Sequence, residues 1–270
     1  MRQPTIPPSA LEAGFRLAPA STHTGRTIML RELSLLLEAS PRCASYDDLQ
    51  RLVVDENVTL KATQAGRKES FRRLRELYGL RRQYAVYLAL RVLWTARPDE
   101  QPLLAMLCAL SRDSLLRATA PVILDQPVDA VLTPQMIAEA LRSQFPDQFS
   151  PIISAAFGRH ALSSWTQSGH AAGRLRKTRT KACIGPASTA YALFLGYLCG
   201  ARGTGLFETL WAETLDSSPA EIDAQAFAAS QRGWIDYRRM GDVVDIGFTL
   251  LRKEQVCTSG VNGDNALLHS

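Results

Sequence analysis

Positively charged side chains are the residues of this sequence whose spacing most clearly favours a chemical task. The segment 61–91 holds nine Lys or Arg and two acidic residues, a formal charge of +7. The segment 148–207 holds seven Lys or Arg and no acidic residue, which is also +7. Because the whole chain carries only +5, the remaining residues together carry −9. Such segregation produces local positive fields that attract polyanions.

The first basic segment is predicted to carry a helix that faces DNA. A helix over 65–78 follows a helix over 46–56 through a short polar linker, an order typical of a helix–turn–helix. In the second helix, apolar residues recur on one stripe and basic residues collect on one flank, which suits packing on one side and phosphate contact on the other. A solvated helix face, helped by an ion pair between Glu69 and Arg73, is the alternative. The candidate contacts of this segment are Lys61, Arg67, Lys68, Arg72 and Arg75.

The second basic segment is predicted to form a flexible cationic loop over 173–181. Each Lys or Arg can neutralise one phosphate and release counterions, and the threonine hydroxyls can donate to phosphate oxygens. No acidic residue within 148–207 is there to pair with these charges. The alternative is a solubilising surface loop, and Trp165 before it is expected to lie in the core rather than to stack on a base. The candidate contacts are Arg174, Arg176, Lys177, Arg179 and Lys181.

Patterns for catalysis or metal binding are weak. The four histidines occur singly, and His160 and His170, ten residues apart, have no nearby carboxylate to complete a metal site or a base–orienter pair. The glycines of 200–205 follow a predicted helix instead of a strand, so they fit neither a dinucleotide fingerprint nor a P-loop. Asp242 and Asp245, with Lys253 beyond them, only loosely imitate the carboxylates of a nuclease. The sequence therefore predicts a non-enzyme with no catalytic residue, no metal and no cofactor.

Helical signals dominate the elements that must position the basic residues. A hydroxyl before a proline at 133–134, 150–151 and 218–219 predicts three helix starts. The strand signal is confined to a β-hairpin over 234–248, which follows a helix in the order of a recognition helix and a wing. Arg238 and Arg239 at its tip are further possible phosphate contacts. The predicted fold class is mainly α: a multi-helix bundle with helix–turn–helix-like elements and a small C-terminal β-hairpin.

Composition and chain organisation bound the class of protein. The chain is 46% hydrophobic and 21% charged, an ordinary globular composition. Five widely spaced cysteines indicate no disulfide framework or zinc site and favour a reducing, cytoplasmic location. No targeting signal is expected, and the longest apolar stretch, 187–199, is too short to span a bilayer. The predicted divisions are a flexible N-terminal arm (1–27), an N-terminal helical domain (28–115), a C-terminal helical domain with the hairpin (116–250) and a tail (251–270).

The run RELSLLLEASPRCASYDDLQRLVVDENVTLKATQAGRKESFRRLRELYGL, over 31–80, resembles the opening of the BrxA family of bacteriophage-exclusion (BREX) defence systems. The shared pattern is a leucine-rich helix, a short helix ending in Asn57, a Thr/Lys linker and an Arg-rich helix. The later SSWTQSGH and GRLRKTR stretches fit the second half of that family less specifically. The resemblance, which spans about 28–250, implies a cytoplasmic, all-helical, non-catalytic DNA-binding protein that works beside methyltransferase and ATPase components. By pattern it aligns Arg67, Lys68, Arg72 and Arg75 as DNA-facing residues.

These observations predict a non-catalytic protein that binds double-stranded DNA mainly through phosphates, using the helix 65–78 and the loop 173–181. Three alternatives remain open. The basic segments of a protein–protein adaptor would dock on acidic surfaces of partner enzymes. An RNA-binding helical module would rely on stacking, which the low aromatic content of 7% disfavours. A nuclease would cleave DNA in the presence of a metal.

Overall fold

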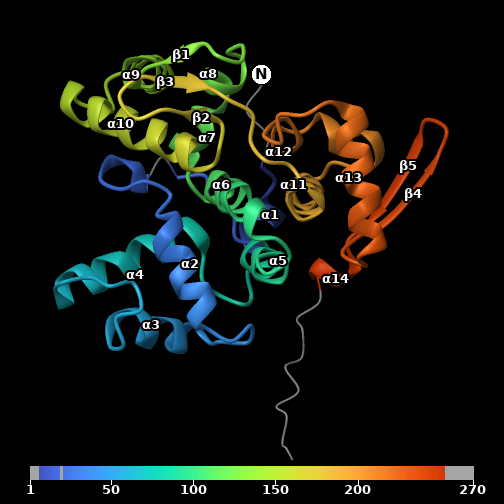
Figure 1. Cartoon of the computed structure of the whole chain (residues 1–270), viewed down its shortest axis with the longest axis horizontal. Helices are drawn as coiled ribbons and strands as arrows, with labels where there is room; N and C mark the ends of the chain where they lie inside the picture. Colours follow the sequence, from blue (N-terminus) through green and yellow to red (C-terminus); the bar gives the residue numbers. More distant parts are fainter. Residues whose placement is uncertain (1–5, 19–20, 253–270) are drawn as a thin grey trace, which may run out of the picture.

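The computed structural model describes residues 6–18 and 21–252, and over these residues the fold is mainly α (Figure 1). Three helices form the centre, and each packs on the other two. The last of them is buried along most of its length because its sequence, PASTAYALFLGYL, is apolar on every side. The buried side chains of the described residues form one continuous hydrophobic cluster around this centre. The three helices are α5 (Ala85–Leu93), α6 (Gln101–Arg112) and α11 (Pro186–Leu198).

The predicted helix–turn–helix-like pair is confirmed as two packed helices. Ser45 caps the first helix, and Thr63 caps the second by accepting a hydrogen bond from Gly66 N–H at 3.1 Å. The second helix ends at Gly79, whose φ of +82° lies in the region that glycine adopts without strain. Helix α2 packs on both members of the pair. These elements are α2 (Leu30–Ala39), α3 (Tyr46–Val54) and α4 (Gln64–Tyr78).

A second group of helices carries a small sheet that the sequence does not predict. The hydroxyls of Thr133 and Ser150 cap two of its helices, as expected from the Thr-Pro and Ser-Pro pairs. Three very short strands pair antiparallel in the order β1-β3-β2, with Ala172 opposite Thr178. The prediction of a flexible loop over 173–181 is therefore wrong for 177–179, which form the central strand. The elements of this group are α7 (Ser114–Ala118), α8 (Ala120–Leu124), β1 (Val131–Leu132), α9 (Pro134–Gln144), α10 (Pro151–Gln167), β2 (Ala171–Ala172) and β3 (Lys177–Arg179), whereas η2 (Pro98–Glu100) leads into the central helix α6.

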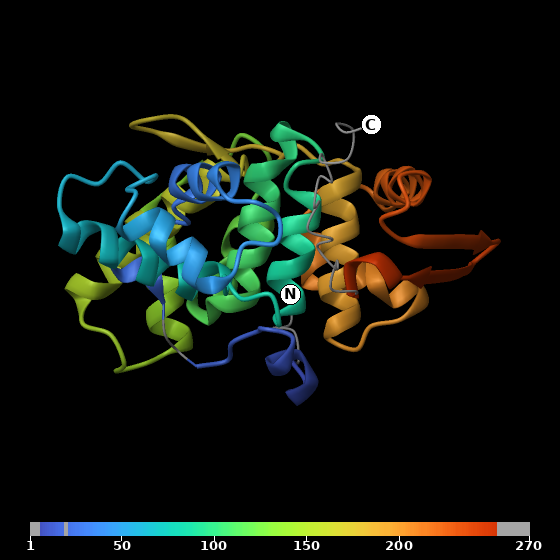
Figure 2. The ribbon, with the colours of Figure 1, turned by 90° about the horizontal axis from the view of Figure 1, so that it is seen from below.

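The C-terminal part confirms the predicted helix and hairpin. Ser218 caps the helix, and the two strands after it pair from Asp236 opposite Gly247 to Met240 opposite Val243. The hairpin projects from one end of the long axis of the molecule (Figures 1 and 2). The elements are η3 (Gly203–Glu208), α12 (Leu210–Glu213), α13 (Pro219–Gln231), β4 (Asp236–Met240), β5 (Val243–Gly247) and α14 (Thr249–Arg252).

The described part of the predicted N-terminal arm is packed on the protein. The segment contains α1 (Pro8–Glu12) and η1 (Thr22–Thr24), and Phe15 is 3% exposed with its ring 5.5 Å from that of Trp211. The prediction of a flexible arm is wrong for these residues because apolar side chains within it find partners in the core. The predicted division between 115 and 116 stays a prediction, although α6 packs on α4 and on α10 alike. Most of the predicted tail lies outside the described residues.

Candidate nucleic-acid interface

Helix α4 presents its basic residues as the sequence predicts, with Phe71, Leu74 and Tyr78 buried beneath them. Lys68 is exposed and has no side-chain partner among the described residues. Arg75 is half-buried, and its Nη1 lies 3.4 Å from the hydroxyl of Tyr46 on α3. These two side chains keep their charge available to a ligand.

Much of the remaining charge of α4 is neutralised within the helix. Arg72 pairs with Glu69 at 2.7 Å and with Glu76 at 2.9 Å, and Arg73 pairs with the same two carboxylates at 2.8 Å and 3.3 Å. The hydrogen bond from Arg72, together with the contact with Arg73, lowers the pKa of Glu69 to about 2. The expected pairing of Glu69 with Arg73 is confirmed, and the network is larger than predicted. Arg72 must leave two carboxylates to meet a phosphate.

Two further predicted contacts of this segment are also engaged internally. Lys61 Nζ lies 2.6 Å from Glu32 Oε1 and ties the α3–α4 linker to α2. Arg67 is half-buried, and its Nη1 donates to the carbonyl of Val54 at 3.4 Å. Both interactions fasten α4 to the helices beside it, so Lys61 and Arg67 have less freedom to contact a ligand than Lys68.

The turn between β2 and β3 gathers exposed cations. Arg174, Arg176 and, beyond β3, Lys181 are exposed and have no side-chain partner among the described residues. Lys177 is half-buried and donates to Thr166 Oγ1 at 2.9 Å. Leu175, between the two arginines, is 99% exposed.

The prediction for Arg179 is wrong: this side chain is structural. Arg179 is 1% exposed, forms an ion pair with Asp216 at 2.8 Å and donates to the carbonyl of Ile123 at 2.9 Å. Its guanidinium also donates to the carbonyl of His170 at 3.2 Å. The carboxylate that neutralises it comes from outside 148–207, which is why the local charge count did not reveal the pair.

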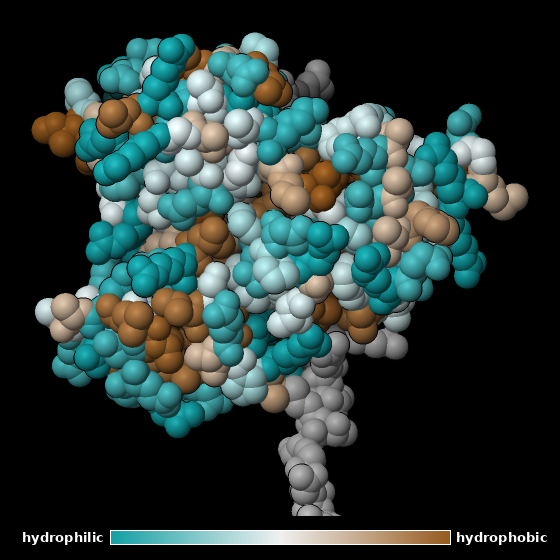
Figure 3. Space-filling model, viewed as in Figure 1, coloured by the Kyte–Doolittle hydropathy of each residue, from teal (hydrophilic) through white to brown (hydrophobic). Residues whose placement is uncertain are grey.

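The two basic segments lie toward the same end of the molecule. In Figures 1 and 2, α4 and the β2–β3 turn are both at the end of the long axis opposite the β4–β5 hairpin, with α10 and η1 between them. In the space-filling view, the edge of the molecule between α10 and α4 carries hydrophilic and neutral side chains with some hydrophobic ones among them (Figure 3). The segment 208–252, which has eight Asp/Glu and four Lys/Arg, contains α13 and the β4–β5 hairpin at the other end.

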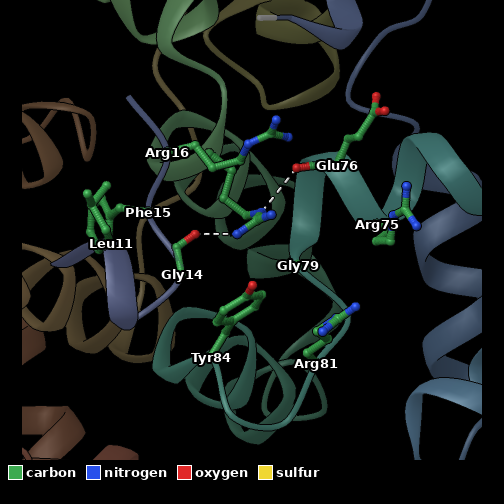
Figure 4. Close-up of a pocket in the computed structure, with 10 residues that line it drawn as sticks. Leu11, Gly14, Phe15, Arg16, Arg75, Glu76, Gly79, Arg81 and Tyr84 are labelled. Carbon is green, nitrogen blue, oxygen red and sulfur yellow. Dashed lines mark hydrogen bonds between the residues drawn. The ribbon is translucent and has the colours of Figure 1, made fainter. Parts of the chain in front are cut away.

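A cavity of about 390 Å³ opens beside the end of α4 and contains arginines that the sequence analysis did not single out. Arg16 and Arg81 lie on opposite sides of it (Figure 4). The buried Arg112 donates from Nε to the carbonyl of Glu76 at 3.0 Å and from Nη1 to the carbonyl of Gly14. Arg81 belongs to the first basic segment and was detectable from its charge, whereas Arg16 lies in the segment predicted to be an arm. The lining residues are Leu11, Gly14, Phe15, Arg16, Arg75, Glu76, Gly79, Arg81, Tyr84 and Arg112.

A buried Asp–His–Ser chain is the second feature missed by the sequence analysis. His23 Nδ1 lies 2.8 Å from Asp113 Oδ2, and His23 Nε2 lies 2.9 Å from Ser164 Oγ. The carboxylate that His23 meets lies 90 residues away in the chain, so no local sequence pattern indicates the pair. Burial raises the pKa of Asp113, and hydrogen bonds from His23, Ser21 and Leu116 N–H outweigh this and hold that pKa below its usual range.

The order of these groups is that of a hydrolase triad, but their surroundings indicate a structural role. His23 and Ser164 are 0% exposed and Asp113 is 3% exposed, so the hydroxyl is closed to a substrate. Ser164 Oγ accepts from Ile28 N–H and donates to the carbonyl of His160, each at 2.9 Å. The chain of hydrogen bonds thus fastens the segment 21–28 to α10 and to the start of α7.

The remaining candidates are the residues that the sequence offered for base stacking, for phosphate contact by the hairpin and for a nuclease-like metal site. Trp165 is buried, as predicted, and donates to Thr119 Oγ1 at 2.8 Å. Of the two hairpin arginines, Arg239 pairs with Asp223 at 2.5 Å, whereas Arg238 is exposed. No group of three or more His, Cys, Asp or Glu in the described part of the chain has an arrangement that would hold a metal ion, and Lys253 lies outside that part. None of the described helices combines the length and apolar character needed to cross a membrane.

Comparison of this chain with protein-family models, with curated proteins and with solved structures finds no match.

Proposed function

We propose that this protein is a non-catalytic DNA-binding protein that contacts the phosphates of a duplex through the β2–β3 turn and the exposed cations of α4. The observation that carries the proposal is the set of exposed cations at the turn, Arg174, Arg176 and Lys181, which have no acidic partner among the described residues. A phosphate backbone supplies the missing negative charge.

The architecture of the turn supports this assignment. Arg179 is buried and anchors β3 in the protein. The backbone that carries the cations before and after Arg179 is therefore fixed in position. Leu175 stands fully exposed between two arginines, a combination that minor-groove binders use when an apolar side chain presses between base steps beside cationic contacts. Lys68 and Arg75 on α4 extend the positive surface at the same end of the molecule.

The resemblance of the N-terminal half to the BrxA family supports the same activity and adds a role in bacteriophage exclusion. On that proposal, the protein acts in the cytoplasm beside other defence-system proteins. The set of contacts is smaller than the sequence suggested: Lys68, Arg75, Arg174, Arg176, Lys177 and Lys181 remain, and Arg72 contributes only if its ion pairs open.

Fluorescence anisotropy with a labelled duplex of about 20 base pairs tests the proposal. The double variant Arg174→Glu/Arg176→Glu should bind at least tenfold more weakly to every duplex sequence, because phosphate contacts carry no sequence information. The matched control Arg232→Glu/Arg238→Glu makes the same change of net charge at the C-cap of α13 and on β4, at the other end of the molecule, and should bind within about twofold of the parent. If both variants lost the same duplex affinity, the loss would come from the change in net charge alone, and this would contradict the proposed surface.

The same assay separates the alternatives. Tighter binding of a single-stranded RNA than of a duplex of equal length would favour an RNA-binding module. Absence of duplex binding at low salt would favour a protein–protein adaptor.

A further inference from the structure

The cavity beside the end of α4 has an excess of positive charge that nothing in its lining neutralises. Four arginines line it, Arg16, Arg75, Arg81 and Arg112, against one acidic residue, Glu76. The carboxylate of Glu76 already binds Arg72 at 2.9 Å and Arg73 at 3.3 Å. The cavity therefore holds up to four guanidinium groups without a free carboxylate among its lining residues.

Two of these arginines have guanidinium N–H groups that could donate to a ligand. Arg16 is half-buried, and its guanidinium has no partner among the described residues. Arg81 is exposed and contacts only the face of Tyr46, with its guanidinium carbon 5.1 Å from the ring centre. Both side chains project from backbone on opposite sides of the cavity, so a bound anion would be held from two directions (Figure 4).

Arg112 forms the buried end of the site. It is 8% exposed, and its bonds to Gly14 and Glu76 carbonyls use Nη1 and Nε, which leaves Nη2 without a partner among the described residues. Burial and the nearby charge of Arg16 lower the pKa of Arg112 from its ordinary value. An anion between Arg16 and Arg112 would remove the repulsion between them.

The dimensions indicate the class of ligand. A volume of about 390 Å³ lies within the range of small-molecule sites, which is roughly 300–1,000 Å³. A duplex does not enter a cavity of this size, whereas a short chain of phosphates does. Planar guanidinium groups match phosphate oxygens in pairs, and several of them together favour a ligand with more than one phosphate.

We propose that this cavity is a binding site for a small ligand that carries two or more phosphate groups, such as a nucleoside diphosphate or triphosphate or an inorganic polyphosphate. The phosphates lie between Arg16, Arg81 and Arg112. Tyr84 lines the cavity beneath Arg112, and its ring, 5.4 Å from that guanidinium carbon, supports the arginine from below. The site joins the N-terminal segment to the end of α4, so its occupancy stabilises the packing of that segment.

Isothermal titration calorimetry with pyrophosphate, ATP and adenosine tests the site. The parent protein should bind pyrophosphate and ATP, and should not bind adenosine at the same concentrations. Tighter binding of ATP than of pyrophosphate would show that the nucleoside or the third phosphate adds contacts, and equal binding would identify a pair of phosphates as the recognised part. Failure of both phosphate probes to bind at millimolar concentration would overturn the proposal, as would binding of adenosine alone.

The variant Arg16→Glu/Arg81→Glu should weaken the binding of both phosphate probes at least tenfold. Neither substituted side chain is needed for folding, because neither donates a hydrogen bond to the described residues, and an unchanged circular dichroism spectrum checks this. The control Arg174→Glu/Arg176→Glu should bind both probes as the parent does. Unchanged affinity in Arg16→Glu/Arg81→Glu would contradict the site, while duplex binding measured on the same two variants reports separately on the proposed function.

Discussion

Arg179 Nη2 lies 2.8 Å from Asp216 Oδ2, and this ion pair joins the central strand of the small sheet to the loop before α13. Arg179 is one of the most buried side chains of the protein, although it belongs to its most basic stretch. The pair fixes the base of the β2–β3 turn, while the neighbouring cations stay exposed. The basic residues of this stretch thus differ in role: Arg179 stabilises the fold from inside, while its neighbours present positive charge to the solvent.

Replacing Arg179 should destabilise the protein, whereas replacing a cation of the tip should not. Arg179→Met leaves Asp216 without its partner and the carbonyl of Ile123 without a donor, and breaking a buried pair in this way costs about 3 kcal/mol. Arg174→Met should change the free energy of unfolding by less than about 0.5 kcal/mol because the side chain is exposed. Urea unfolding followed by circular dichroism measures both. Similar stabilities of the two variants would show that the Arg179 pair contributes little.

Buried arginines explain much of the difference between the charge pattern and the structure. Arg91 donates to the carbonyls of Leu37 and Ser40 at the end of α2, and Arg117 donates to the carbonyl of Leu110 near the end of α6. Arginines placed in this way satisfy terminal carbonyls and suit the negative end of the helix dipole. A count of charges along the chain cannot separate them from surface residues, because a partner lies 54 residues away for Arg91 and 101 residues away, at the carbonyl of Arg16, for Arg117.

The helices were predictable because their signals are local. Caps such as Thr133 and Ser150 and the apolar stripe of α4 lie within a few residues of the elements they specify. The strands β1 to β3 were not predictable, because two or three residues carry no periodicity and pairing joins 131–132 to 177–178. The cavity was missed for a similar reason, since Arg16 meets α4 only through tertiary packing. Of the basic residues proposed from sequence, only Arg179 proved fully buried.

The turn itself depends on Gly173. Its φ is +104°, and a Cβ placed there would lie 2.0 Å from the carbonyl oxygen of Arg176, which is backbone that cannot move without opening the turn. Gly173→Ala should therefore disrupt the tip and weaken duplex binding severalfold. Because the tip is exposed, the midpoint of thermal unfolding should change by only a few degrees. Gly205→Ala, at a site with open space around the Cβ, is the matched control and should leave duplex binding unchanged.

Leu175 should contribute to DNA binding without contributing to stability. The side chain is 99% exposed, so Leu175→Ser removes no folded-state packing and should leave the free energy of unfolding within about 0.5 kcal/mol of the parent. If Leu175 presses between base steps, the variant should bend a duplex less, as measured by energy transfer between dyes at its two ends. Equal bending by parent and variant would assign binding at the turn to phosphate contacts alone.

Acid should destabilise the protein through His170. Burial, with a smaller effect from the charge of Arg179, lowers the pKa of His170 to about 4, whereas an unfolded histidine titrates near 6.5. The unfolded chain therefore takes up a proton that the folded protein does not, and stability that is complete above pH 6.5 falls by up to about 3 kcal/mol as the pH decreases toward 4. Carboxylates with a lowered pKa, such as Asp113, act at still lower pH.

Urea unfolding at pH 7, 5.5 and 4.5 measures this loss. The variant His170→Gln keeps a donor for the carbonyl of Thr214, which lies 2.8 Å from His170 Nε2, and removes the titrating group. It should be less stable than the parent at pH 7 and should lose less stability between pH 6.5 and 4. A parent whose free energy of unfolding is constant over this range would show that His170 is not held neutral by burial.

The salt dependence of duplex binding tests most directly the claim that exposed cations of the β2–β3 turn contact phosphates. For the parent, the logarithm of the association constant should fall linearly with the logarithm of salt concentration, with a slope set by several phosphate contacts. Arg174→Gln/Arg176→Gln/Lys181→Gln should reduce the magnitude of that slope by about 0.9 for each contact removed, and Arg238→Gln should leave it unchanged. An identical slope in the triple variant and the parent would contradict the account.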